Sequence, residues 1–132
     1  MATIKSHTDI SQSKTLSKIL PLESADLHYH YNNDFDELES IPTITEEDDH
    51  FVLFPKDVRC WSLAELLSVI PQEIFDGEYI INITEGRTNR WMLTYDNYEI
   101  GNHSYYSLST GADNLIDCCV EMIIKLKERN LL

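Results

Sequence analysis

The residues best suited to chemistry are two histidines that follow an aspartate in the run Asp26-Leu27-His28-Tyr29-His30. In an extended strand, His28 and His30 would lie on one face, about 7 Å apart along the chain. Two imidazoles placed in this way can chelate a divalent cation, which can then activate a water molecule. The run therefore offers a candidate metal site with Asp26, His28 and His30 as its ligands.

The same five residues resemble the opening motif of the amidohydrolases and of the polymerase-and-histidinol-phosphatase class of metal hydrolases. Those enzymes build their sites on barrels, and a full barrel takes about 250 residues. The chain has 132 residues, and it contains no second histidine cluster, because His50 and His103 are isolated. We therefore interpret the run as part of a short strand over residues 27–31, expect both rings to lie partly exposed on an edge strand, and predict no metal ligands.

Other residue types do not combine into a catalytic or cofactor site. The acidic run that starts at Asp34 lacks the central glycine and the late glutamate of an EF-hand loop, and four glycines in the chain leave no phosphate-binding loop. Cys60 stands alone, and the adjacent Cys118 and Cys119 would point about 100° apart on a helix. We interpret all three as buried, inert thiols. The sequence thus predicts no cofactor and no catalytic residue, and it favours a protein that is not an enzyme.

Negative charge is concentrated in one part of the chain. The net charge is -13, and no lysine or arginine lies between Lys18 and Lys56. This interval holds ten acids: Glu23, Asp26, Asp34, Asp36, Glu37, Glu39, Glu46, Glu47, Asp48 and Asp49. Their charge repels phosphate, so we expect no direct binding of nucleic acid. The segment is either a solvated loop that aids solubility or a surface that meets a basic protein.

Aromatic residues stand in and beside the acidic interval, namely Phe35, Phe51 and Phe54. Apolar residues flanked by acids suggest a docking surface, on which charge sets the association rate and aromatic side chains the affinity. The candidates for partner contact are Phe35, Glu46, Glu47, Asp48 and Asp49.

Three classes of function follow from these features. The first is a non-catalytic interaction module whose protein partner has a basic surface. The second is an acidic inhibitor that occupies a DNA-binding surface by mimicking phosphate charge, and the third is a small metal-dependent hydrolase that uses the Asp-x-His-x-His run. Self-association of the chain is also left open.

The elements that must position these residues follow from the apolar pattern. Helices are expected over residues 9–20, from the capping box Ser62-Leu63-Ala64-Glu65 to Pro71, and from Thr110 or a neighbour to about Arg129. Strands are expected over residues 27–31, 51–54, 78–84, 90–95 and 103–108. The sequence predicts a single α+β domain over residues 9–132, in which a three-stranded antiparallel meander packs against the short capped helix and the long C-terminal helix. Residues 1–8 should fray, and an acidic loop should cover about 32–50.

The last helix has the clearest pattern. With about 100° per residue, its apolar side chains fill an arc of roughly 200°, which predicts burial against a sheet and another helix. Met122 and Leu115 lie within this arc, and Cys118 falls at its polar edge. We therefore expect Cys118 to be less buried than Cys119.

Three segments carry a resemblance to a known group of proteins: "QSKTLSKILPLESADLHYHY", "CWSLAELLSVIP" and "TGADNLIDCCVEMIIKLKERNLL". Together they resemble small uncharacterised proteins encoded by prophages and phages of Bacteroides-type gut bacteria, from about Ser11 onward. The resemblance implies a bacterial or phage protein of the cytoplasm and brings no established activity. No apolar run reaches the roughly 20 residues that span a bilayer, and the first five residues lack the apolar core of a secretion signal. Both observations favour a cytoplasmic protein without a membrane partner.

Overall fold

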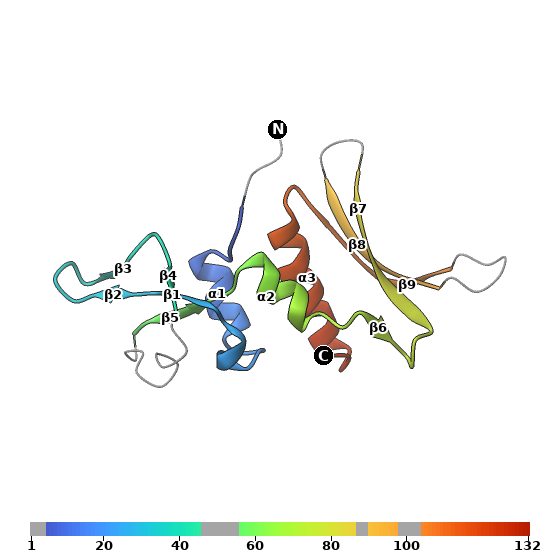
Figure 1. The fold of residues 1–132 in the computed structure, drawn as a ribbon, viewed down its shortest axis with the longest axis horizontal. Coiled ribbons are helices and arrows are strands. Elements are labelled where there is room, and N and C mark those ends of the chain that lie inside the picture. Colours follow the sequence, from blue (N-terminus) through green and yellow to red (C-terminus); the bar gives the residue numbers. More distant parts are fainter. Residues whose placement is uncertain (1–4, 46–55, 87–89, 98–103) are drawn as a thin grey trace. The chain divides into compact units, whose positions relative to one another are not determined.

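The computed structural model describes residues 5–45, 56–86, 90–97 and 104–132. Its helices and antiparallel sheets confirm the predicted α+β class (Figure 1). Contacts divide the chain into two compact units. The N-terminal unit spans Ser6–Leu66, and the C-terminal unit spans Leu67–Leu132 together with Lys5. The sequence predicted one domain over residues 9–132, and the number of independently folding domains stays a prediction.

The N-terminal unit begins with helix α1, Ile10–Leu16. Asp9 caps it, because its carboxylate accepts the N–H of Gln12 at 2.8 Å while the Gln12 side chain accepts the N–H of Asp9 at 3.1 Å. The helix buries Leu16 completely. It stops short of the predicted residue 20, and a 3-10 turn, Leu22–Ser24, follows Pro21.

Residues 6 to 8 are held in place at the start of this unit. The backbone N–H of Thr8 donates to the carbonyl of Trp61 at 3.0 Å, and Thr8 is fully buried. His7 forms an isolated β-bridge with Ser62. In the C-terminal unit, the Lys5 ammonium lies 2.9 Å from a carboxylate oxygen of Asp117. The prediction that residues 1–8 fray is therefore wrong for residues 5–8, because partners far along the chain hold them.

The sheet of the N-terminal unit is antiparallel and has the order β4-β1-β5. Strand β1 is Leu27–Tyr29, β4 is Thr43–Ile44 and β5 is Val58–Cys60. A separate hairpin joins β2, Tyr31–Asn32, to β3, Glu37–Leu38. The region predicted as an acidic loop over 32–50 thus contains paired strands up to residue 44. Residues 46–50 and the strand expected over 51–54 lie outside the described residues.

The C-terminal unit contains a four-stranded antiparallel sheet in the order β6-β7-β8-β9. Its strands are β6, Glu73–Ile74; β7, Tyr79–Glu85; β8, Trp91–Asn97; and β9, Ser104–Ala112. The predicted meander corresponds to β7, β8 and β9, and β6 adds a short fourth strand. The turn before β7 contains Gly77 at φ 86°, a conformation that favours glycine. The Tyr95 hydroxyl donates to the Pro71 carbonyl at 2.6 Å, and burial raises its pKa to about 12.

The long helix α3, Leu115–Glu128, packs against β8 and β9 (Figure 1). Its cap is Asn114, whose side chain accepts the N–H of Asp117 at 2.9 Å. The helix was expected to begin at Thr110 or a neighbour, but Thr110 lies in β9 and donates its hydroxyl to the carbonyl of Cys118 at 3.1 Å. That prediction failed because β9 runs further than the apolar pattern indicated.

Helix α3 buries more of its circumference than the apolar arc predicted. Cys118 and Cys119 are both fully buried, so the placement of Cys118 at a polar edge was wrong. Its thiol donates to the carbonyl of Trp91 at 3.0 Å, which shows that β8 covers this flank of the helix. Leu115, expected within the arc, is only half-buried, whereas Met122 is fully buried.

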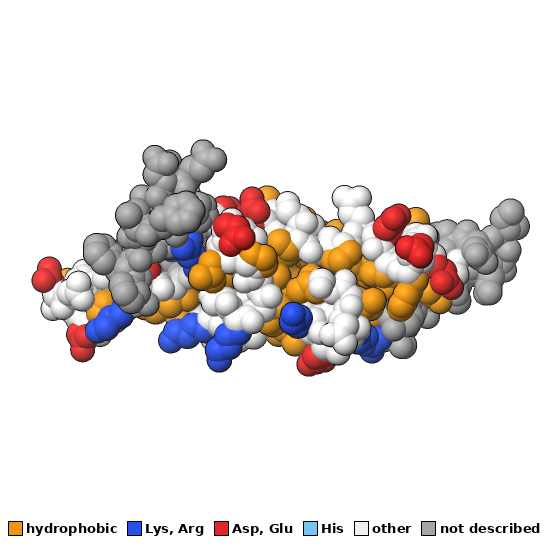
Figure 2. All heavy atoms as spheres, turned by 90° about the horizontal axis from the view of Figure 1, so that it is seen from below, with side chains coloured by type: hydrophobic (Ala, Val, Ile, Leu, Met, Phe, Trp, Pro, Cys, Tyr) orange, Lys and Arg blue, Asp and Glu red, His pale blue; other side chains and the backbone are white. Residues whose placement is uncertain are grey.

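The short helix α2, Leu63–Val69, begins after Ser62 as predicted. The Ser62 hydroxyl accepts the N–H of Glu65 at 3.4 Å, which is one half of the expected capping box. The boundary between the two units falls within this helix. Within the described residues, no helix is long and apolar enough to cross a membrane. Figure 2 shows that hydrophobic side chains also reach the surface, with acidic side chains beside some of them.

Candidate functional site

Each member of the Asp-x-His-x-His run has a partner of its own. An Asp26 carboxylate oxygen accepts the backbone N–H of Ser62 at 2.9 Å. The His28 ring is hydrogen-bonded to the Thr45 hydroxyl at 2.8 Å, and the Nδ1 atom of His30 lies 3.3 Å from a carboxylate oxygen of Asp57. In these contacts the three side chains hold different segments of the N-terminal unit together.

The expectation that both rings lie on an edge strand was wrong. Strand β1 is the central strand of its sheet, where His28 faces Thr43 of β4 on one side and Arg59 of β5 on the other. His28 is only 8% exposed. His30 follows the strand and is about two-fifths exposed. Among the described residues, no three His, Cys, Asp or Glu side chains form a group that could hold a metal ion, and the structure does not gather Asp26, His28 and His30 into one.

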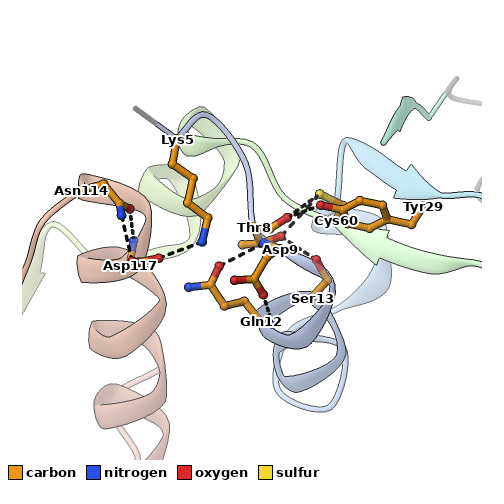
Figure 3. Close-up of polar contacts among 9 residues, drawn as sticks. All are labelled: Lys5, Thr8, Asp9, Gln12, Ser13, Tyr29, Cys60, Asn114 and Asp117. Atoms are coloured by element: carbon orange, nitrogen blue, oxygen red, sulfur yellow. Dashed lines mark hydrogen bonds and ion pairs between the residues drawn. The ribbon is translucent and has the colours of Figure 1, made fainter. Parts of the chain in front are cut away.

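A buried polar cluster connects the first residues of the N-terminal unit to β5, and Figure 3 shows Ser13, Tyr29 and Cys60 converging on Thr8. The Thr8 hydroxyl lies 2.7 Å from the Ser13 hydroxyl and accepts the backbone N–H of Trp61 at 3.1 Å. The Thr8 carbonyl accepts the Tyr29 hydroxyl at 2.8 Å and the Cys60 thiol at 3.3 Å. We call these five residues the Thr8 cluster. It satisfies buried polar groups and so stabilises the unit.

The three cysteines are free thiols in buried positions, which confirms their predicted burial. Burial raises the pKa of Cys60 and of Cys118, and it raises the pKa of Cys119 to about 12. A nucleophilic cysteine needs a thiolate and access to its substrate. These thiols are protonated at neutral pH and enclosed, so their geometry opposes a nucleophilic role.

The β2–β3 hairpin has a different character, because its side chains point largely into solvent. The N–H of Glu39 donates to the His30 carbonyl at 2.8 Å, and the N–H of Asp34 donates to the Asn32 side chain at 2.9 Å. Asp36 adopts φ 52° in the turn. The Tyr31 hydroxyl donates to the Asp36 carboxylate, and this hydrogen bond raises the tyrosine pKa. These contacts give the hairpin a defined shape despite its short strands.

The hairpin and the segment after it form an open groove of about 410 Å³. Its lining comprises Asn32, Phe35, Glu37, Leu38, Glu39, Ser40 and Ile41, which we call the hairpin groove. Phe35 is 73% exposed and Ile41 is 75% exposed. Four acids of the same hairpin are also exposed: Asp34, Asp36, Glu37 and Glu39. The groove therefore combines apolar side chains with carboxylates at the surface, an arrangement suited to binding rather than to bond making.

One of the predicted partner-contact residues, Phe35, lies in the hairpin groove. The other four, Glu46, Glu47, Asp48 and Asp49, lie outside the described residues. Leu38 and Ile41 also line the groove, and Ile44 in β4 is 69% exposed, although none of the three was predicted as a partner-contact residue. A usable signal existed, since these are isolated apolar residues in an acidic segment without the periodicity of a buried element.

Comparison with protein-family models, with curated proteins and with solved structures finds no match for the chain. The resemblance to prophage-encoded proteins stays a prediction.

Proposed function

We propose that the chain is a non-catalytic protein-interaction module that docks on a basic protein partner through the hairpin groove. The exposure of Phe35 and Ile41, 73% and 75%, is the observation that carries the proposal. A large apolar side chain left in water forgoes roughly 1.5–3 kcal/mol that burial would provide. A partner that covers both side chains would recover this free energy.

The charge around the groove supports a basic partner. Glu37 and Glu39 line the groove, and Asp34 and Asp36 are exposed in the adjoining turn. The chain as a whole carries a net charge of -13. Such a field accelerates encounter with a cationic surface and opposes an acidic one. The same field opposes a second copy of the chain at this site.

The first experiment is affinity capture with the wild type and with the double variant Phe35→Ser, Ile41→Ser. The matched control is Ile80→Ser with Met92→Ser, two positions of the C-terminal unit that are 45% and 42% exposed. A protein retained by the wild type and by the control, but not by the groove variant, is then purified and titrated directly. We expect the groove variant to weaken its binding at least tenfold, or about 1.4 kcal/mol. Equal affinity of the wild type, the groove variant and the control variant for this partner would contradict the proposal.

The acidic stretch outside the described residues provides a second experiment. Converting Glu46, Glu47, Asp48 and Asp49 to Asn or Gln should slow association with the same partner and reduce its salt dependence. Stopped-flow measurements at two salt concentrations would test this effect. An unchanged association rate would leave that stretch as a solvated segment.

An acidic inhibitor of a DNA-binding protein is a second candidate, because four exposed carboxylates stand close together along one hairpin. A phosphate mimic works through charge, so the Phe35→Ser, Ile41→Ser variant should keep its inhibition and Glu37→Gln with Glu39→Gln should lose it. If the chain docks through apolar contact, both double variants should bind the captured partner more weakly than the wild type. Competition with DNA for the captured partner separates the two functions.

The metal-hydrolase hypothesis has a direct chemical test. We expect purified wild type and the variant His28→Ala, His30→Ala both to contain metal far below one equivalent, since each histidine has a structural partner. Elemental analysis by mass spectrometry measures this content. Stoichiometric metal in the wild type that is lost in the variant would restore the hydrolase class.

A further inference from the structure

We infer that the hairpin groove accepts a short linear peptide in which one large apolar side chain stands between lysine or arginine residues. This inference rests on the proposed function and narrows the partner from a basic protein to a basic peptide segment with an apolar anchor.

The size of the groove favours a peptide. Its volume, about 410 Å³, is in the lower part of the range of small-ligand pockets, roughly 300–1,000 Å³. A stable interface between folded proteins buries about 800 Å² on each partner and involves about 20–30 residues a side. Seven residues line the groove. This surface matches a few side chains of a linear segment better than the flat face of a folded protein.

The lining explains why an apolar anchor would enter. Phe35 and Ile41 are the most exposed apolar residues of the lining, and Leu38 between them is half-buried. An apolar anchor in contact with these three side chains would remove apolar surface of both molecules from water. Asn32 and Ser40 complete the lining and supply polar groups of the kind that a peptide backbone needs.

The flanking charges follow from the carboxylates and from one contact within the chain. Glu37 and Glu39 stand two positions apart in the lining, on either side of Leu38, so basic residues beside the anchor would meet them. The hairpin already holds a cation on an aromatic ring, because the Lys56 ammonium lies 4.6 Å from the centre of the Tyr31 ring. An incoming cation would meet the Phe35 ring and the carboxylates of Glu37 and Glu39 in one lining.

Other occupants fit the groove less well. A second copy of the chain would bring its own net charge of -13 against these acids. A neutral apolar molecule would cover carboxylates without compensating their charge, which costs free energy. Nucleic acid is repelled by the same charge.

The test uses a short fluorescein-labelled peptide with a phenylalanine between two pairs of arginines, measured by fluorescence anisotropy against the full chain. Two matched peptides replace the phenylalanine by serine or the arginines by glutamines. We expect the first peptide to bind at least tenfold more tightly than either matched peptide at physiological salt. The Phe35→Ser, Ile41→Ser and the Glu37→Gln, Glu39→Gln variants should each weaken binding at least tenfold, and the Ile80→Ser, Met92→Ser control should not change it.

A variant of Lys56 tests how much charge contributes to peptide binding. Its replacement in Lys56→Ala removes a positive charge and frees the Tyr31 ring. We expect the affinity for the arginine peptide to rise about two- to threefold, because one repulsive partner is lost. A decrease in affinity would contradict the role of charge in the groove.

The outcomes separate this inference from the proposed function. If the peptides do not bind but a captured basic protein still depends on Phe35 and Ile41, the peptide inference is wrong and the docking function stands. If the peptide without phenylalanine binds equally well, attraction is by charge alone and the apolar anchor is refuted. If neither the peptides nor any captured partner depend on the groove residues, both proposals fail.

Discussion

The two units differ in how much of their exposed apolar side chains lies in water. In the C-terminal unit the exposed large apolar residues Phe75, Ile80, Ile83, Met92 and Leu132 are 39–46% exposed. In the N-terminal unit, Leu22 is 42% exposed, and Phe35, Ile41 and Ile44 are 69–75% exposed. Isolated apolar residues at a surface are ordinary, but residues with most of their area in water gain more from being covered. The hairpin groove, which we propose as the docking surface, contains two of these three most exposed side chains, Phe35 and Ile41.

The units also differ in what stabilises them. The C-terminal unit has strands of seven to nine residues in β7, β8 and β9. Its helix of 14 residues packs its apolar side chains against β8 and β9. The N-terminal unit has strands of two or three residues and depends on the buried Thr8 cluster. Disruption of apolar packing should therefore destabilise the C-terminal unit most. Loss of a buried hydroxyl should destabilise the N-terminal unit most.

The largest effect is expected from Met122→Asp, which places a charge in the fully buried face of α3. An uncompensated buried charge costs about 3–5 kcal/mol, enough to unfold the C-terminal unit. Circular dichroism during thermal unfolding measures the loss, with Glu121→Asp at the exposed neighbouring position as the control. Leu115→Asp should cost less, since Leu115 is half-buried. A melting temperature of Met122→Asp equal to that of the control would contradict the packing of α3.

The next effect concerns the polar cluster of the N-terminal unit. Thr8→Val keeps the volume but removes the hydroxyl that meets Ser13 and accepts the Trp61 N–H, so it should cost about 1–3 kcal/mol. Thr15→Val is the control, because the Thr15 hydroxyl bonds the Ser11 carbonyl at an exposed position. Urea denaturation followed by tryptophan fluorescence measures both. Equal free energies of unfolding would mean that the cluster contributes little.

A smaller difference is expected between the two adjacent cysteines. The Cys118 thiol already donates to the Trp91 carbonyl, and a serine hydroxyl can donate to the same oxygen. Cys119 is fully buried, and burial raises the pKa of its thiol to about 12, so a serine hydroxyl there would be taken out of water. Cys119→Ser should therefore cost about 1 kcal/mol more than Cys118→Ser. Identical melting temperatures would show that the hydroxyl at position 119 finds a partner in α3 itself.

The smallest effect on stability should come from the candidate interface. Phe35→Ser with Ile41→Ser removes side chains that lie mostly in water, so the free energy of unfolding should change by less than about 0.5 kcal/mol. Urea denaturation of the same variant used for capture provides the measurement. A loss above about 1 kcal/mol would assign these residues to the core and remove the basis for a docking groove.

Local patterns were sufficient for the elements with strong periodicity. The apolar pattern over residues 90–95 predicted β8, and the apolar arc of the last helix predicted α3. The candidate site was predicted only in part, through Phe35. Leu38 and Ile41 were missed because their grouping depends on the β2–β3 hairpin, whose strands are too short for periodicity to reveal.

The sequence by itself determined the α+β class, the meander, the position of the long helix and the concentration of acids before residue 50. Each of these features depends on residues that are close together in the chain. Only the tertiary structure decided that His28 lies in a central strand, that Thr8 is buried, that β8 covers Cys118 and that Phe35 and Ile41 share one groove. Burial is a property of which distant segments come together. A side chain of the same type can therefore be core, hydrogen-bonded or exposed, and nothing in its immediate sequence distinguishes these outcomes.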